Sequence, residues 1–102
     1  MNPTNGRKMA STSTEIKNCI IEAQRQRYAG RCVETGGIMP TATATLPCSA
    51  GDVVIKLVAH SPYQKSFAKV EHPTLGNWMC YLNGGSTNNG EFGNNPGKPI
   101  KL

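Results

Sequence analysis

The stretch that most constrains this chain is residues 12–29, TSTEIKNCIIEAQRQRYA, which predicts one amphipathic helix. Thr12 and Glu15 stand at the spacing of a capping box, in which each side chain satisfies a backbone amide of the first turn. Gly30 follows, and glycine readily adopts the left-handed conformation that ends a helix. Apolar side chains recur on one face, at Ile16, Cys19, Ile20 and Ala23. The helix is therefore expected to have one dry face.

An isolated helix of this length is marginal in water, so its apolar face must pack against the strand-rich segment that follows. Strands are predicted at 52–60, 66–72 and 77–82, joined by short turns as an antiparallel meander. The Thr/Ala alternation at 41–45 indicates a possible fourth strand at the edge, with its threonines toward solvent. The expected fold class is α+β, with one N-terminal amphipathic helix packed on a small antiparallel sheet.

The alternation of side chains assigns faces to these strands. Residues 53, 55, 57 and 59 share an apolar face, and the strand at 77–82 is apolar on both sides, which predicts a central position. The strand at 66–72 is ambiguous, because Lys69 and Glu71 share a side with Phe67. We expect an edge strand whose charges discourage aggregation; the alternative is that Ala68 and Val70 face the helix.

Length and composition predict one domain with a thin core. The chain has 102 residues, of which 17% are charged, and it is rich in Asn, Thr, Ser and Gly. Residues 1–11 are expected to be a flexible leader, 12–83 the single α+β domain, and 84–102 an irregular Asn/Gly-rich tail.

Charge and hydropathy limit the possible partners. The formal charge of +5 is mild, and the run Arg25, Arg27 and Arg31 is explained by the helix C-terminus, so nucleic acid is a possible partner but not the favoured one. No apolar run is long enough to predict a transmembrane segment. The composition favours an extracytoplasmic location (periplasmic, secreted or cell surface); if Met1 is the native start, the cytoplasm is expected instead.

Four cysteines predict a disulfide framework. Cys19 with Cys32 is unfavourable, because roughly 15 Å of helix separates Cys19 from the helix end. We expect Cys19 to pair with Cys80 and Cys32 with Cys48; reduced buried thiols are the alternative. The cysteine spacings of 13, 16 and 32 residues lack the close pairs of structural zinc sites, so no metal ligand is predicted.

The histidines raise the question of an enzyme, such as a small nuclease. If the strands at 53–60 and 66–72 pair, His60 and His72 lie about 17 to 20 Å apart, too far to act on one substrate atom. His60 with Glu34, or His72 with Glu71, is left as an alternative pair, but a lone histidine at a strand end is more often a solvated residue. A cysteine nucleophile is not favoured either, because no cysteine has a motif that lowers its pKa. We therefore predict no catalytic residues, no cofactor and no enzyme activity.

The order helix, long loop and meander, with Trp78, Met79 and Cys80 in the last strand, resembles the soluble globular domain of type IV pilin-like subunits over about residues 12–83. The resemblance implies a surface-assembly subunit whose helix is the remainder of a longer one. The chain departs from the pattern, because it lacks the apolar N-terminal half-helix and a cysteine after Cys80.

The functional expectation is a non-enzymatic extracytoplasmic structural or binding domain, with a protein partner or self-assembly. Contacts are expected from the loop at 36–48 and from the Asn/Gly-rich stretch at 83–95, since exposed loops carry most binding functions. The alternatives are a small secreted nuclease or hydrolase, and an intracellular phage- or mobile-element-type protein that binds a protein or nucleic acid.

Overall fold

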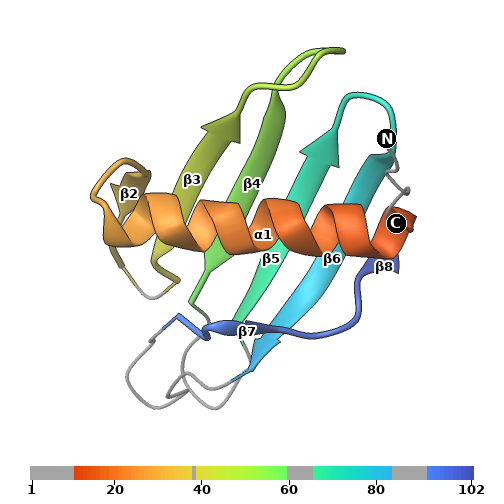
Figure 1. Ribbon diagram of the computed structural model, residues 1–102. Helices are drawn as coiled ribbons and strands as arrows, with labels where there is room; N and C mark the ends of the chain where they lie inside the picture. The colour runs from red at the N-terminus through yellow and green to blue at the C-terminus, as the bar shows by residue number, and fades with distance from the viewer. Residues whose placement is uncertain (1–10, 38, 60–65, 84–91) are drawn as a thin grey trace.

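The computed structural model describes residues 11–37, 39–59, 66–83 and 92–102 (Figure 1). One helix, α1 (Thr12–Tyr28), crosses one face of an antiparallel sheet of seven strands. The strands are β2 (Val33–Thr35), β3 (Thr41–Leu46), β4 (Val53–Val58), β5 (Ser66–His72), β6 (Gly76–Asn83), β7 (Asn95–Pro96) and β8 (Ile100–Lys101).

The helix follows the sequence pattern closely. Ile16, Cys19, Ile20 and Ala23 are buried against the sheet, as their spacing predicts. The N-cap is Ser11 rather than Thr12, because the Ser11 hydroxyl accepts from the Thr14 amide at 3.1 Å. Gly30 ends the helix with a φ of 73°. Glu15 therefore does not form the expected capping box with Thr12. Its carboxylate accepts from the Cys19 thiol instead.

The observed sheet corrects the expected fold class. We expected an α+β domain with a small sheet of three strands and a possible fourth at the edge, which is wrong, because the sheet has seven strands. The strands lie in the order β2-β3-β4-β5-β6-β7, and β8 also pairs with β6. β7 pairs with the end of β6 at Leu82 and Asn83, while β8 pairs with its start at Trp78 and Met79. β2, β7 and β8 are only two or three residues long, so backbone pairing defines them and side-chain alternation does not reveal them. The described chain is mostly β.

β5 is a central strand and not the expected edge. It pairs with β4 on one side and with β6 on the other. Ala68 and Val70 are buried under the helix, and Lys69 and Glu71 are exposed on the opposite face. A strand with one apolar face and one charged face is compatible with the centre of a sheet when only one face is covered.

The core lies between α1 and the covered face of the sheet. Its sheet side comes from alternating residues of four strands, and small alanines on β3 and β5 allow the helix to approach. These buried side chains are Ala42, Ala44, Val53, Ile55, Leu57, Ala68, Val70, Cys80 and Leu82.

Residues 92–102 complete this arrangement, where the sequence predicts an irregular tail. The Gly93 amide donates to the Ser66 hydroxyl at 2.8 Å, and the Gln24 side chain donates to the Gly93 carbonyl at 3.0 Å. Phe92 packs against the core. Residues 84–91 of that stretch, and residues 1–10 of the expected leader, lie outside the described part.

The pilin-like arrangement is also corrected. That resemblance implies a helix on a small sheet, whereas α1 packs across a long antiparallel meander that includes strands before and after the expected three. The described helix does not have the length and hydrophobicity needed to cross a bilayer.

Candidate functional site

The sheet has a second face, which we call the open face, on the side away from α1. Because side chains alternate, every second residue of β3, β4, β5 and β6 points to it. Among the described residues, the one helix lies on the other side of the sheet (Figure 1). The pairing register arranges the open-face side chains in rows that run across the strands.

The first row contains two aromatic side chains. Phe67 of β5 lies directly opposite Tyr81 of β6, and Val58 of β4 lies on the other side of Phe67. Phe67 is half-buried, whereas Tyr81 is 44% exposed. Two neighbouring rings therefore form a partly exposed aromatic surface in this first row.

The second row contains two lysines. Lys56 of β4 and Lys69 of β5 are register partners, both exposed, with Thr43 and Met79 at the ends of the row. Among the described residues neither lysine forms an ion pair. Like charges directly opposite each other on a sheet are destabilising, so this pair does not serve the stability of the fold.

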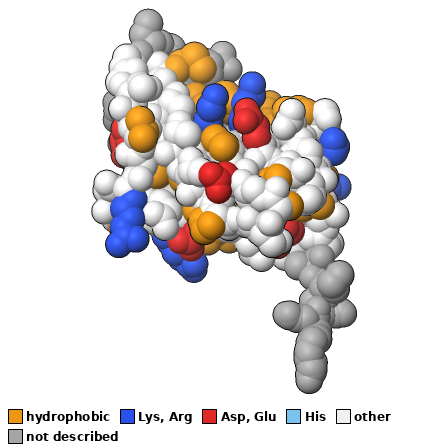
Figure 2. Space-filling view, turned by 90° about the horizontal axis from the view of Figure 1, so that it is seen from above, with side chains coloured by type: hydrophobic (Ala, Val, Ile, Leu, Met, Phe, Trp, Pro, Cys, Tyr) orange, Lys and Arg blue, Asp and Glu red, His pale blue; other side chains and the backbone are white. Residues whose placement is uncertain are grey.

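A groove of about 460 Å³ joins the two rows at the β3 side of the sheet. Its lining combines threonine hydroxyls and apolar groups with both lysines: Thr35, Met39, Thr41, Thr43, Lys56, Val58, Phe67 and Lys69. The acidic Glu71 lies in the third row, opposite Val54 and Asn77, on the far side of the lysines from the aromatic rings. In Figure 2, basic, acidic and apolar side chains stand together along the upper margin, the side away from α1.

The four cysteines do not form the expected disulfides. All four are free in the structure, which corrects both the Cys19–Cys80 and the Cys32–Cys48 pairing. The thiol of Cys80 donates to the Gly97 carbonyl at 3.4 Å, at the β7 edge of β6, and the thiol of Cys32 donates to the Ala23 carbonyl at 3.8 Å. These two thiols are held by backbone carbonyls instead of by a second sulfur.

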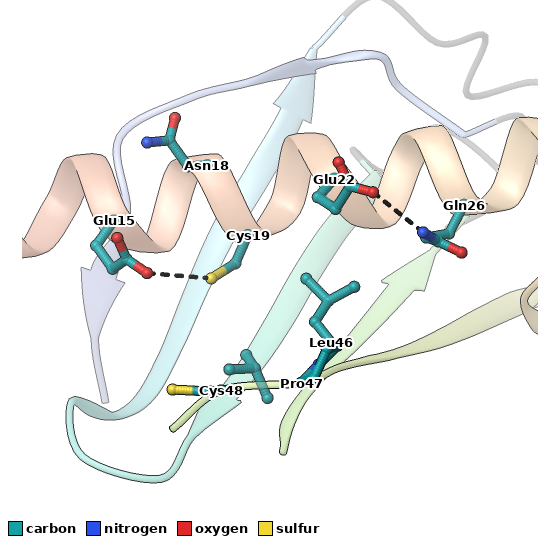
Figure 3. A pocket seen from close by; sticks show the side chains of 9 residues that line it. Glu15, Asn18, Cys19, Glu22, Gln26, Leu46, Pro47 and Cys48 are labelled. Atoms are coloured by element: carbon teal, nitrogen blue, oxygen red, sulfur yellow. Dashed lines mark hydrogen bonds between the residues drawn. The ribbon is translucent and has the colours of Figure 1, made fainter. Parts of the chain in front are cut away.

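Cys19 and Cys48 line a second groove, between α1 and the β3–β4 connection (Figure 3). The Cys19 thiol donates to the Glu15 carboxylate at 3.9 Å. Burial raises the pKa of Cys19 to about 11, with further contributions from the negative charge of Glu15 and from Cys48. Since the thiolate is the nucleophilic form, Cys19 is a poor nucleophile at neutral pH.

His72 and the carboxylate considered as its partner lie on opposite faces of the sheet. His72 is only 9% exposed at the end of β5, and its Nδ1 lies 3.2 Å from the backbone nitrogens of Thr74 and Leu75. Glu71 lies on the open face, away from the side of His72. Glu34 forms an ion pair with Arg27 at 3.8 Å, and the other considered pair, His60 with Glu34, lies outside the described residues because His60 does.

The expected contact loops are also placed differently. Residues 41–46 of the segment 36–48 form β3, a strand inside the sheet, and residues 84–91 of the stretch 83–95 lie outside the described residues. Sequence reasoning did not single out Lys56 and Tyr81 as candidate binding residues, although alternation along each strand sets them apart from the buried face. What alternation could not supply is the register that places Lys56 beside Lys69 and Tyr81 beside Phe67. Comparison with protein-family models, curated proteins and solved structures finds no match for this chain.

Proposed function

We propose that the chain binds single-stranded nucleic acid on the open face. The observation that carries the proposal is the register of the two rows, which places Lys56 and Lys69, without an ion pair in the described part of the chain, next to the rings of Phe67 and Tyr81. Aromatic rings on a sheet surface stack with unpaired bases, and neighbouring cations bind the phosphates that join those bases.

The like-charge pair is the argument for a polyanion. Two lysines opposite each other repel. A phosphate bound between them attracts both ammonium groups and offsets this repulsion. Threonine hydroxyls on the neighbouring strand β3 supply further donors to phosphate oxygens. A purely apolar protein partner would leave both ammonium groups without a counterion.

The size of the surface favours a short single strand. The row from Thr41 to Tyr81 crosses four adjacent strands spaced about 4.8 Å apart, so it is roughly 14 Å long. Sheets of four strands in other nucleic-acid-binding domains stack two or three bases on their aromatic side chains. A duplex keeps its bases stacked inside and offers this surface no exposed rings.

The reduced cysteines and the overall charge support the same proposal. Four free thiols are typical of a compartment that keeps cysteines reduced, in which nucleic acids are also present. The net charge of +5 favours encounters with a polyanion. The proposal therefore takes up the intracellular nucleic-acid binder that the sequence left as an alternative.

Fluorescence anisotropy with labelled 12-nucleotide RNA and DNA strands tests the proposal. We expect single strands to bind more tightly than a duplex of the same sequence, and log affinity to fall linearly with log salt. Each phosphate contact contributes about 0.7 to that slope for single strands, so the double variant Lys56→Gln/Lys69→Gln should lower it by about 1.4. Lys17→Gln, on the exposed side of α1, is the matched control and should leave the slope within a few tenths.

The aromatic contribution is tested separately. Tyr81→Ala should weaken binding by about 1 to 3 kcal/mol with little change in the salt slope, because base stacking is not electrostatic. Tyr28→Ala is the control, since Tyr28 is 74% exposed at the end of α1. Affinity that is unchanged in both the Tyr81 and the double lysine variants would contradict the proposal, as would tighter binding to the duplex.

A further inference from the structure

Three side chains that commonly bind metals meet at one end of the interface between helix and sheet, on the opposite side of the sheet from the open face. Glu15 and Cys19 are one turn apart on α1, and His72 is the last residue of β5. A carboxylate oxygen, the sulfur and a ring nitrogen all lie within 4.8 Å of one another. The proposed nucleic-acid surface uses none of these residues.

We propose that Glu15, Cys19 and His72 bind a zinc ion, with Cys48 as the fourth ligand. Thiolate, imidazole and carboxylate are the three ligand types that zinc takes from proteins, usually four in a tetrahedron. A hard cation such as magnesium or calcium would require mainly oxygen ligands, and this site offers one carboxylate.

The distances agree with this geometry after a small movement. Zinc bonds of about 2.0 to 2.3 Å in a tetrahedron place neighbouring ligand atoms about 3.3 to 3.8 Å apart. The three atoms are already within 4.8 Å, so shifts of about 1 Å would bring them into place. The exposed Glu15 side chain lies at the edge of a groove of about 380 Å³ and can make such a shift.

Cys48 lies on the other wall of the groove, and its sulfur is not one of the atoms that lie within 4.8 Å of one another. Figure 3 shows its sulfur and that of Cys19 facing the same space, one from the β3–β4 connection and one from the helix. A hydrogen bond of 3.1 Å from the Gly51 amide to the Cys48 carbonyl closes the turn that presents this cysteine. An ion at this place would join α1, the β3–β4 connection and the end of β5, which is the effect of a structural zinc site.

The second ring nitrogen of His72 is held by its neighbours. The backbone amides of Thr74 and Leu75 donate to Nδ1 at 3.2 Å, and the Thr74 hydroxyl lies 3.2 Å from the same atom. These bonds favour the neutral tautomer with its proton on Nε2, so metal binding at Nε2 requires that proton to move to Nδ1, with loss of the two amide bonds. A metal-bound histidine usually keeps a second partner on its other nitrogen, and the Thr74 hydroxyl can then accept from Nδ1.

Binding has a defined proton balance. Each of the two cysteine sulfurs exchanges its bond to hydrogen for a bond to zinc, so one proton leaves from each thiol and passes to the buffer. The Nε2 proton of His72 moves to Nδ1, and Glu15 binds as its carboxylate, so neither residue releases a proton to the buffer. No oxidant or reductant is involved.

Cobalt(II) chloride provides the direct test, with the full-length protein kept reduced and free of metal beforehand. We expect one cobalt ion per chain, intense d–d bands typical of a tetrahedral site, and a charge-transfer band from sulfur to cobalt. Zinc should displace the cobalt and raise the melting temperature, because a ligand that binds only the folded state stabilises it.

Variants assign the site to its residues. Cys19→Ser should abolish the charge-transfer band or shift it strongly, and Cys48→Ser should weaken it, while Cys32→Ser, a half-buried cysteine outside the groove, should leave it unchanged. Glu15→Gln is expected to fold normally, since Glu15 is exposed, and to weaken binding more than the roughly 10- to 100-fold that loss of an outer partner costs. Thr74→Val should fall within that 10- to 100-fold range.

Circular dichroism of the metal-free variants separates loss of binding from loss of folding. A cobalt spectrum without the sulfur band would overturn the proposal. So would a band that survives in folded Cys19→Ser, or zinc affinity in Glu15→Gln equal to that of the unmodified chain. A band unchanged in Cys48→Ser would remove Cys48 from the site.

Discussion

The two faces of the sheet are built from the same strands but from different chemistry. Along β4, Ile55 and Leu57 are buried under the helix, whereas Lys56 between them is exposed on the open face. β3 likewise buries Ala42 and Ala44 and turns its threonines outward. The side chains of the covered face form the hydrophobic core. Those of the open face contribute little to the core, so their identity is less constrained by stability. Residues that are buried in the core and residues of the proposed binding surface therefore lie one position apart in the same strand.

Of the substitutions that compare the two faces, Leu57→Ala should cause the largest loss in the free energy of unfolding. Leu57 is 1% exposed, and removing a buried leucine side chain costs about 2 to 5 kcal/mol of unfolding free energy. Its neighbour Lys56→Ala, on the open face, should stay within about 0.5 kcal/mol. Urea unfolding followed by circular dichroism measures both. Equal losses in the two variants would mean that the faces do not differ in their contribution to stability.

Gly93→Ala tests the backbone contact that ties the C-terminal segment to the covered side. A Cβ at this position would lie 2.5 Å from the Leu82 carbonyl oxygen, and backbone atoms cannot move aside as a flexible side chain would. The hydrogen bonds of Gly93 to Ser66 and Gln24 would be strained as well. We expect a loss of about 1 to 3 kcal/mol by the same urea measurement. Gly36→Ala, with no atom within 4 Å, is the control and should change little.

The covered face also predicts a dependence on alkaline pH. Burial raises the pKa of Cys19 from 9.0 to about 11, helped by Glu15 and Cys48. Above pH 9 the thiol ionises in the unfolded chain first, so the free energy of unfolding should fall as pH rises from 9 to 11 and then level off. Below pH 9 the thiol is protonated in both states and contributes no pH dependence. In Cys19→Ala, compared over the same range in metal-free buffer, this part of the slope should disappear; an identical slope would contradict the assignment.

Much of the covered face could be predicted from the sequence, because each side chain there leaves a periodic signal. The stripe on α1 and the alternation in β4 both correspond to buried residues. The position of β5 could not be predicted, since Lys69 and Glu71 disfavour burial of one face without revealing that the other face is buried. β2, β7 and β8 are too short to show a period and depend on pairing with their neighbours.

The candidate sites were harder to predict, because both depend on contacts between residues distant in sequence. Lys56 and Lys69 are placed together by the β4–β5 register, which a lysine in each strand does not specify. Glu15 and Cys19 stand one helical turn apart, a spacing that the search for close cysteine pairs overlooks, and His72 reaches them only through the packing of α1 on β5. Cys19 was correctly placed on the buried face of the helix, but the thiols of Cys32 and Cys80 are directed by backbone carbonyls that no sequence pattern identifies.

Lys56→Glu should produce the smallest change in stability and separates the two faces most sharply. The change replaces two opposed lysines by an opposite-charge pair with Lys69, which should stabilise the fold by about 0.2 to 1 kcal/mol at low salt and lose most of that gain at 1 M salt. The same change places a carboxylate beside the aromatic rings, where a phosphate would be repelled. Binding of single strands should therefore weaken more than in Lys56→Gln while the protein becomes more stable. If binding and stability instead fell together, the lysine pair would contribute to the fold, and the argument that it is kept for a polyanion would fail.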